Sequence, residues 1–237
     1  MINMFIRKIG CMVLLLGCLN LSASDSADHE SDWIVPKWAI DSLNMPKDAF
    51  IKANSDFSLI MSEHRNEALG MKKGYDHFWD TALIYIKNDK VKALTLAFSR
   101  DFPKARRNCL KTLVKLIVRY GSKFEIAQVE LDHTIAPDGK GYGLHWTTKN
   151  YDVLLKFGPL NNEKNGKFQL QIILDANPGE SFFMEMDVPG AGGQIKMWRR
   201  VVEYFEATAP RDPELETLKK IHYTPLSEKE KRSDIAI

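Results

Sequence analysis

The stretch "WDTALIYIKNDKVKALTLAFSRDF", residues 79–102, carries the clearest β-hairpin pattern in this chain. Two apolar, alternating runs flank Asn88 and Asp89, residues that tolerate the left-handed backbone of a tight turn. We therefore predict two antiparallel strands joined at this dipeptide. Because such strands have an apolar side, the hairpin needs a second layer of structure against which to bury it.

The residues that follow the hairpin predict that second layer. Asp101 suits the N-cap of a helix, Pro103 its first turn and Gly121 its C-terminal end. Between them, apolar residues recur at intervals of three and four, which is the spacing of one helical face. We expect this face to pack on the sheet through Leu110, Leu113, Val114, Ile117 and Tyr120.

Other segments have the composition of strands, while "HRNEALGMKKGYD" (64–76) is expected to be a polar excursion. The pair "YGLHWTT" and "YDVLLKF" is joined at Lys149 and Asn150 and predicts another hairpin. The predicted fold is α+β: a mainly antiparallel sheet built from hairpins, with one long helix packed on it and a C-terminal helix. The remaining predicted strands are 57–63, 124–131 and 168–176.

The N-terminus, "MINMFIRKIGCMVLLLGCLNLSA" (1–23), has the pattern of a secretory signal peptide. Arg7 and Lys8 precede an apolar run, 9–16, that is too short to span a bilayer. Two cleavage sites compete. The motif "LLGC" resembles a bacterial lipobox, in which case Cys18 would be lipidated and begin the mature chain; an ordinary signal peptidase would instead cut after Ala23.

The sequence thus predicts an exported protein, in the periplasm or as an outer-membrane or cell-surface lipoprotein. A polar tether (24–32), a single α+β domain (33–209) and a charged C-terminal tail (210–237) would follow the signal peptide. Of the 237 residues, 44% are hydrophobic, which is ordinary for a domain with a core, and the net charge is only +2. That charge gives no reason to expect nucleic-acid binding.

The glycine-rich stretch "DVPGAGGQIKMWRRVVEYF" (187–205) invites comparison with a phosphate-binding loop. Gly193 is followed by Gln194 and Ile195, where a phosphate loop needs lysine and then serine or threonine. Ile195 also stands where the dinucleotide-binding fingerprint needs its third glycine. We interpret the stretch as a turn followed by a helix from about residue 195 to 205, and we expect no cofactor.

Candidate catalytic residues are few. Cys109 lies on the apolar side of the predicted long helix and is expected to be core. His133 and His145 flank a loop, with Glu130 and Asp132 nearby, and two imidazoles with carboxylates can ligate zinc or perform acid–base work. None of the compact zinc-binding spacings is present, so solvated histidines are the simpler interpretation and no metal is assigned.

A basic stripe is predicted on the outer side of the long helix, at about 100° per residue. It could contact anionic lipid or an anionic envelope polymer, or it could simply be the solvated back of the helix. Without interleaved aromatic residues it does not suit nucleic acid. The basic stripe consists of Lys104, Arg107, Lys111, Lys115 and Arg119.

The order "WDTALIYIKNDKVKALTLAFSRD", a helix, "YGLHWTTKNYDVLLKF" and "FQLQIILDANP" resembles a noncatalytic N-terminal domain of some secreted bacterial proteins. In those proteins a papain-like, C39-type peptidase domain can follow. No cysteine follows "MDVPGAGGQ" in this chain, so the resemblance carries over no catalytic residue. It implies an accessory domain that stands alone.

The sequence favours a noncatalytic envelope lipoprotein or binding domain, with an envelope protein or polymer as its partner and the membrane as a further contact if Cys18 is lipidated. The alternative is an envelope hydrolase that uses His133 and His145, with or without a metal. Exposed tryptophans could form part of a binding surface, although most are expected to be core; the candidates are Trp33, Trp38, Trp146 and Trp198.

Overall fold

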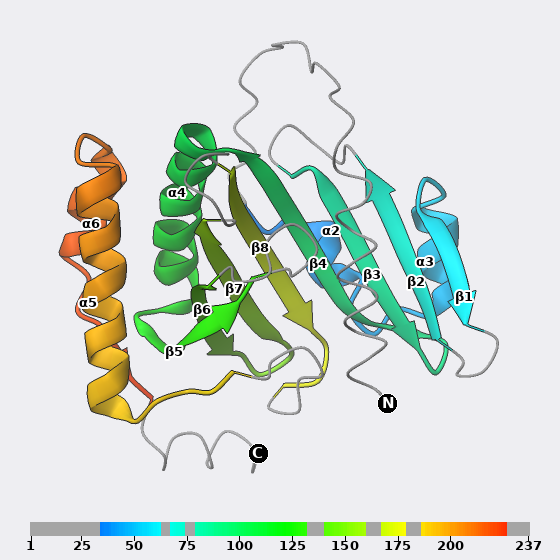
Figure 1. The fold of residues 1–237 in the computed structure, drawn as a ribbon. Helices are drawn as coiled ribbons and strands as arrows, with labels where there is room; N and C mark the ends of the chain where they lie inside the picture. The colour runs from blue at the N-terminus through cyan, green and yellow to red at the C-terminus, as the bar shows by residue number, and fades with distance from the viewer. Residues whose placement is uncertain are drawn as a thin grey trace.

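The computed structural model describes residues 34–62, 67–73, 79–131, 140–159, 167–178 and 186–226. Within them, nine strands form one sheet in the order β1-β2-β3-β4-β8-β7-β6-β5-β9, and every pairing is antiparallel except that of β5 with β9 (Figure 1). The strands are β1 (Ser58–Ser62), β2 (Glu67–Lys73), β3 (Thr81–Lys87), β4 (Lys90–Asp101), β5 (Lys123–Glu130), β6 (Lys140–Thr147), β7 (Asp152–Pro159), β8 (Lys167–Asp175) and β9 (Thr224–Pro225).

The predicted hairpin lies in this sheet as β3 and β4. Asn88 and Asp89 both adopt positive φ, 51° and 63°, as a type I′ turn requires. The second predicted hairpin is β6 and β7, in which Thr147 pairs with Asp152 across the turn at Lys149 and Asn150. The mainly antiparallel α+β fold is therefore confirmed.

Helices cover one face of the sheet, where they enclose the main hydrophobic core (Figure 1). Cys109 and Leu113 of α4 are fully buried in this core, as the apolar spacing predicted. Phe124 of β5 meets the rings of Trp146 and Trp198 at centroid distances of 5.0 and 5.4 Å. The helices are α2 (Lys37–Asp41), α3 (Lys47–Ala53), α4 (Phe102–Tyr120), α5 (Ala191–Thr208) and α6 (Pro213–Lys219).

The opposite face of the sheet carries a second, smaller apolar cluster made by Val129, Leu131 and Met186. Glycines make room for it: a Cβ atom on Gly143 would lie 2.6 Å from a Val129 methyl group and 2.7 Å from the Met186 sulfur. A Cβ atom on Gly158 would lie 2.8 Å from Leu131. These side chains thus pack directly on the backbone of β6 and β7.

Two segments differ from the prediction. The segment expected to be a polar excursion contains β2, which pairs with both β1 and β3. The chain also remains packed beyond residue 209, because α6 buries Leu215 and Leu218 and β9 pairs with β5. The strand β2 pairs with its neighbours in sequence, β1 and β3, whereas α6 and β9 contact α4, α5 and β5. In both places tertiary contacts outweigh a weak local signal.

A helix follows Pro189, as predicted, but α5 begins at Ala191 rather than near residue 195. Gly192 and Gly193, which were expected to form the turn, therefore lie in its first turn. Its first turn places Gln194 inside the protein, 1% exposed. The Gln194 side chain accepts hydrogen bonds from the Ile126 N–H and the Tyr223 hydroxyl, and it donates one to the Pro189 carbonyl. This amide therefore joins α5 to the sheet and to the C-terminal segment.

The signal region 1–23, with Cys18, and the tether 24–32 lie outside the described residues. Trp33 and His133 also lie outside them. Across the ranges that are described, none of the helices combines the length and the apolar character needed to cross a bilayer.

Candidate functional site

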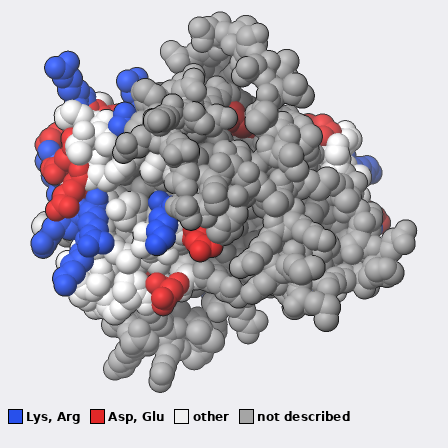
Figure 2. All heavy atoms as spheres, viewed as in Figure 1, with Lys and Arg blue, Asp and Glu red and all other residues white. Residues whose placement is uncertain are grey.

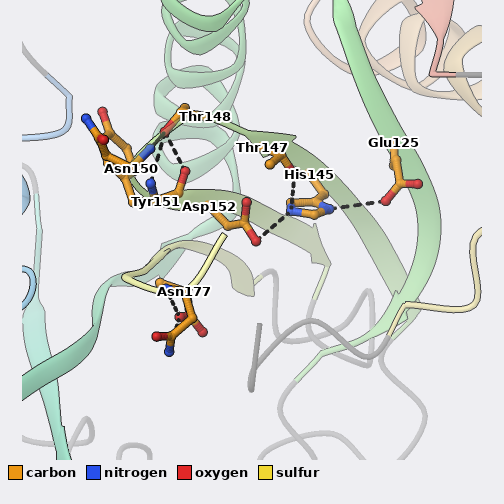
Figure 3. A network of polar contacts seen from close by, with 9 residues as sticks. Glu125, His145, Thr147, Thr148, Asn150, Tyr151, Asp152 and Asn177 are labelled. Carbon is orange, nitrogen blue, oxygen red and sulfur yellow. Dashed lines mark hydrogen bonds and ion pairs between the residues drawn. The ribbon is translucent and has the colours of Figure 1, made fainter. Parts of the chain in front are cut away.

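The candidate site is a charged cluster centred on His145, on the sheet face opposite the helices. His145 lies on β6, between Glu125 on β5 and Asp152 on β7 (Figure 3). The register places Glu125 directly opposite His145, whereas Asp152 pairs with Thr147 and so approaches His145 diagonally. We call Glu125, His145 and Asp152 the histidine cluster.

Both nitrogens of the imidazole have a carboxylate neighbour. Nδ1 of His145 lies 3.2 Å from Oε2 of Glu125, and Nε2 lies 3.5 Å from Oδ2 of Asp152. The side chains are largely removed from water, with exposed fractions of 13% for His145, 15% for Glu125 and 0% for Asp152. The imidazole therefore bridges three adjacent strands.

The cluster fixes the protonation state of His145. Burial alone would lower its pKa, but hydrogen bonds to Asp152 and Glu125, with their negative charges, outweigh burial and raise the pKa to about 9. The ring is therefore an imidazolium at neutral pH, and both of its nitrogens carry protons. In that state it can donate two hydrogen bonds and cannot accept a proton.

The row of polar groups continues to β8. Asp175 lies opposite Asp152 in the register, and both carboxylates are buried. Asp175 accepts hydrogen bonds from the backbone N–H and the side-chain amide of Asn177, at 2.9 and 3.3 Å. Each of the two buried carboxylates thus has its own compensating donor, as buried charges require.

The β6–β7 turn holds the histidine cluster in place. The Thr148 hydroxyl donates to the carbonyl of Tyr151 at 2.6 Å and accepts from its N–H at 3.1 Å (Figure 3). This local ring of hydrogen bonds fixes the turn. Because the turn sets the register, it also sets the diagonal approach of Asp152 to His145.

A hydroxyl group also lies beside the imidazole. Oγ1 of Thr147 is 3.4 Å from Nε2 of His145, so Thr147, His145 and Glu125 form a hydroxyl–imidazole–carboxylate line (Figure 3). That order is the one used to activate a nucleophile. Here, however, Asp152 contacts the same nitrogen, so in this arrangement the nitrogen carries a proton and cannot accept one from Thr147.

The described residues contain no group of three or more His, Cys, Asp or Glu side chains placed to hold a metal ion. In the histidine cluster both imidazole nitrogens face carboxylates, whereas a ligating imidazole needs one nitrogen free for the metal. His133, the second histidine of the site suggested by the sequence, lies outside the described residues.

The basic stripe lies along α4, away from the histidine cluster. Arg107 and Arg119 are exposed, and Lys111 and Lys115 are half-exposed. One edge of the stripe touches α6, where Nε of Arg107 lies 4.0 Å from Oδ2 of Asp212. Lys104 belongs to α4, but its side chain is outside the described part of the structure.

Other candidates from the sequence belong to the core. Cys109 is fully buried, and burial raises the pKa of its thiol well above the usual value, so it does not suit a nucleophile. Trp146 and Trp198 are 2% and 8% exposed, so these two tryptophans belong to the core and do not form a binding surface. Trp38 is half-buried against the main core.

Sequence reasoning identified His145 but missed both of its partners. The signal for Asp152 was present in the predicted β6–β7 hairpin, because a short turn at Lys149 and Asn150 brings these two strands into register. Glu125 had no such signal, since no short turn motif in the sequence joins its strand to β6.

Comparison with known proteins adds little. No protein family matches the chain, and no curated protein matches it. Among solved structures it is similar to an extracellular protein containing an SCP domain from Bacillus anthracis strain Ames, with a TM-score of 0.30 and 5% identity. The similarity covers 79% of this chain and 64% of that one, so the chain spans less than two thirds of its length. A TM-score this low establishes neither a shared fold nor a shared function.

Proposed function

We propose that this protein is a noncatalytic, exported binding or accessory domain of the cell envelope. The observation that carries the proposal is the state of His145, the histidine in the described ranges best placed for acid–base work. Its two carboxylate neighbours keep it charged, so its role is to bind three strands together. Export is supported by the signal-like N-terminus, in which Arg7 and Lys8 precede a short apolar run.

The electrostatics disfavour catalysis by this histidine. A general base works best when its pKa lies near the working pH, so that the neutral form is abundant. With a pKa of about 9, roughly one His145 ring in a hundred is neutral at pH 7. An imidazolium could act as an acid, but Glu125 and Asp152 already accept both of its protons.

The rival function is an envelope hydrolase, and one observation favours it. Thr147, His145 and Glu125 stand in the order of a nucleophile, a base and an orienting acid, and Thr147 is exposed to solvent. The sequence also suggested that His133 could take part in such a site. For this function Asp152 would have to release Nε2 when substrate binds.

A hydrolysis assay separates the two functions. The mature protein, purified from its host, would be assayed from pH 6 to pH 10 against casein, peptidoglycan and an ester substrate, beside His145→Gln, His133→Gln and Thr147→Ala. We expect no turnover above the background of the His145→Gln variant. Turnover that Thr147→Ala and His145→Gln abolish, and that rises with pH as the imidazole loses its proton, would establish the hydrolase.

The location of the protein in the envelope depends on which residue begins the mature chain after the signal peptide is removed. We propose that Cys18 is lipidated, as the "LLGC" motif suggests, and that the domain is anchored in the periplasm or on the outer membrane or cell surface. The intact mass of the mature protein tests this proposal. A chain that begins at Cys18 and carries a diacylglyceryl group is expected in the membrane fraction. A soluble, unmodified chain that begins at Ser24 would contradict the anchor but not export.

A further inference from the structure

The charged side chains of α4 itself are all of one sign. Its sequence, Phe102–Tyr120, contains six lysine and arginine residues and no aspartate or glutamate. The helices at the edge of the molecule are different: over α5 and α6, basic and acidic side chains are interspersed (Figure 2, left). On α5, for example, Glu203 and Glu206 follow Arg199 and Arg200. A helix surface that only faces water can carry charges of both signs, so the exclusively basic charge of α4 calls for an explanation.

An exposed apolar residue stands within the basic stripe. Val118 is 77% exposed, and among the described residues only Ile195 is a further large hydrophobic residue that is exposed. At about 100° per residue it falls between Arg107 and Lys115 around the helix axis. Lys115 precedes it by three positions, and Arg119 follows it directly. The stripe is therefore a band of positive charge around one apolar side chain.

We propose that the basic stripe of α4 with Val118 docks on the anionic phospholipid headgroups of a membrane. Charge complementarity selects an anionic partner, and Val118 favours a membrane over a soluble polyanion. An apolar region lies just beneath the phosphates of a headgroup layer, and proteins that bind in the membrane interface bury apolar side chains in it. A polymer of phosphate or sulfate groups would satisfy the charges and leave Val118 in water.

This inference rests on the proposed function, because a lipid anchor would keep the domain close to the bilayer. Each basic residue near an anionic surface strengthens binding by roughly fivefold, so the stripe alone would bind weakly. An anchored domain does not need tight binding, since tethering raises its effective concentration at the surface. The stripe would then orient the domain, with α4 toward the lipid and the opposite face of the sheet pointing away from the membrane.

The test is cosedimentation of the mature protein with vesicles. One set contains phosphatidylcholine alone and the other contains phosphatidylcholine with about one third phosphatidylglycerol, so that an anchor inserts equally into both. We expect at least tenfold stronger partitioning to the anionic vesicles, lost at high salt as screening predicts. Lys111→Glu with Lys115→Glu should abolish this preference, and Val118→Ser should weaken it severalfold.

The matched control is Lys196→Glu with Arg199→Glu on α5, two exposed residues outside the stripe whose replacement changes the net charge by the same amount. Circular dichroism establishes that each variant is folded, and Val118→Ser supplies a test that keeps every charge. Equal losses in the stripe and control variants would overturn the proposal, because net charge would then explain the binding. So would wild-type binding to dextran sulfate in the absence of any preference for anionic vesicles. Neither result would affect the noncatalytic assignment, which the hydrolysis assay decides.

Discussion

Glu125 and Asp152 lie on strands that are not neighbours in the sheet, yet both contact the imidazole of His145 on the strand between them. The two carboxylates approach different nitrogens of the same ring, so one proton-dependent charge joins β5, β6 and β7. The candidate site therefore also contributes to the stability of the fold. Its contribution to stability can be measured separately from any activity.

Replacement of His145 by glutamine should destabilise the protein strongly. The glutamine keeps a polar group in the site but removes the positive charge that lies between Glu125 and the fully buried Asp152. Breaking a buried ion pair in this way costs about 3 kcal/mol. Urea unfolding measures the difference, and His222→Gln, at an exposed histidine, is the control that should change the free energy of unfolding little. Equal stability of the two variants would contradict a structural role for the histidine cluster.

The stability of the protein should fall at alkaline pH. The pKa of His145 rises from 6.5 in the unfolded chain to about 9 in the folded one. A raised pKa means that the folded state binds the proton more tightly, so this stabilisation is complete below pH 6.5 and is lost as pH rises through 9. Its size is about 3 kcal/mol, from the free energy of one pKa unit.

Urea unfolding at several pH values from 6 to 10 would measure this loss. The His145→Gln variant should lack this part of the pH dependence, since it has no proton to lose at that position. An NMR titration of the imidazole protons would give the pKa directly. A midpoint near 6.5 in the folded protein would show that Glu125 and Asp152 do not hold the ring charged.

Two glycine-to-alanine substitutions should have opposite effects. In Gly143→Ala the new methyl group would meet Val129 and Met186 at 2.6 and 2.7 Å, so these side chains must move, at a cost of about 2 kcal/mol. In Gly192→Ala the methyl group meets nothing within 4 Å and lies in the first turn of α5. Alanine restricts the unfolded chain there and should stabilise the protein by about 0.5 kcal/mol. Melting temperatures of the two variants that move in the same direction would contradict this packing.

Gln194→Ala should destabilise the protein by about 2 kcal/mol, because the buried Ile126 N–H loses its acceptor. The Tyr223 hydroxyl keeps a second partner, the carbonyl of Phe124 at 3.1 Å, so the loss falls mainly on β5 and α5. Hydrogen exchange should show faster exchange of the Ile126 amide in the variant. Gln128→Ala, at an exposed position on the same strand, is the control and should leave that amide unchanged. Unchanged exchange in both variants would mean that Gln194 does not protect the strand.

The fold was predictable wherever short-range patterns matched the final contacts. The Asn88–Asp89 turn and the apolar spacing of α4 are local signals, and both were interpreted correctly. The strand β2 was missed because Gly70 and two lysines, Lys72 and Lys73, weaken its alternation, and its partners β1 and β3 supply the stability. The helix α6 is too short for a periodic signal and is held by the burial of Leu215 and Leu218.

The candidate site was less predictable than the fold. The sequence indicated His145 as a candidate because histidine is a common catalytic residue. Its environment, however, depends on how β5, β6 and β7 are aligned with one another. A single sequence does not specify the alignment of strands that no short turn connects. The sequence suggested His133 as its partner, and that residue lies outside the described ranges. The partners that the structure gives it, Glu125 and Asp152, convert a candidate base into a fixed positive charge.

The closure of the C-terminal segment over β5 also constrains the order of folding. Tyr223 packs its ring on Phe124, 4.6 Å between centroids, and its hydroxyl donates to the Phe124 carbonyl across 99 positions of sequence. A growing or partly translocated chain lacks this contact until residue 223 has emerged, so the aromatic end of the core stays open to water until late. If the protein is exported as proposed, a core that closes only after residue 223 is available would keep the chain unfolded while it crosses the membrane.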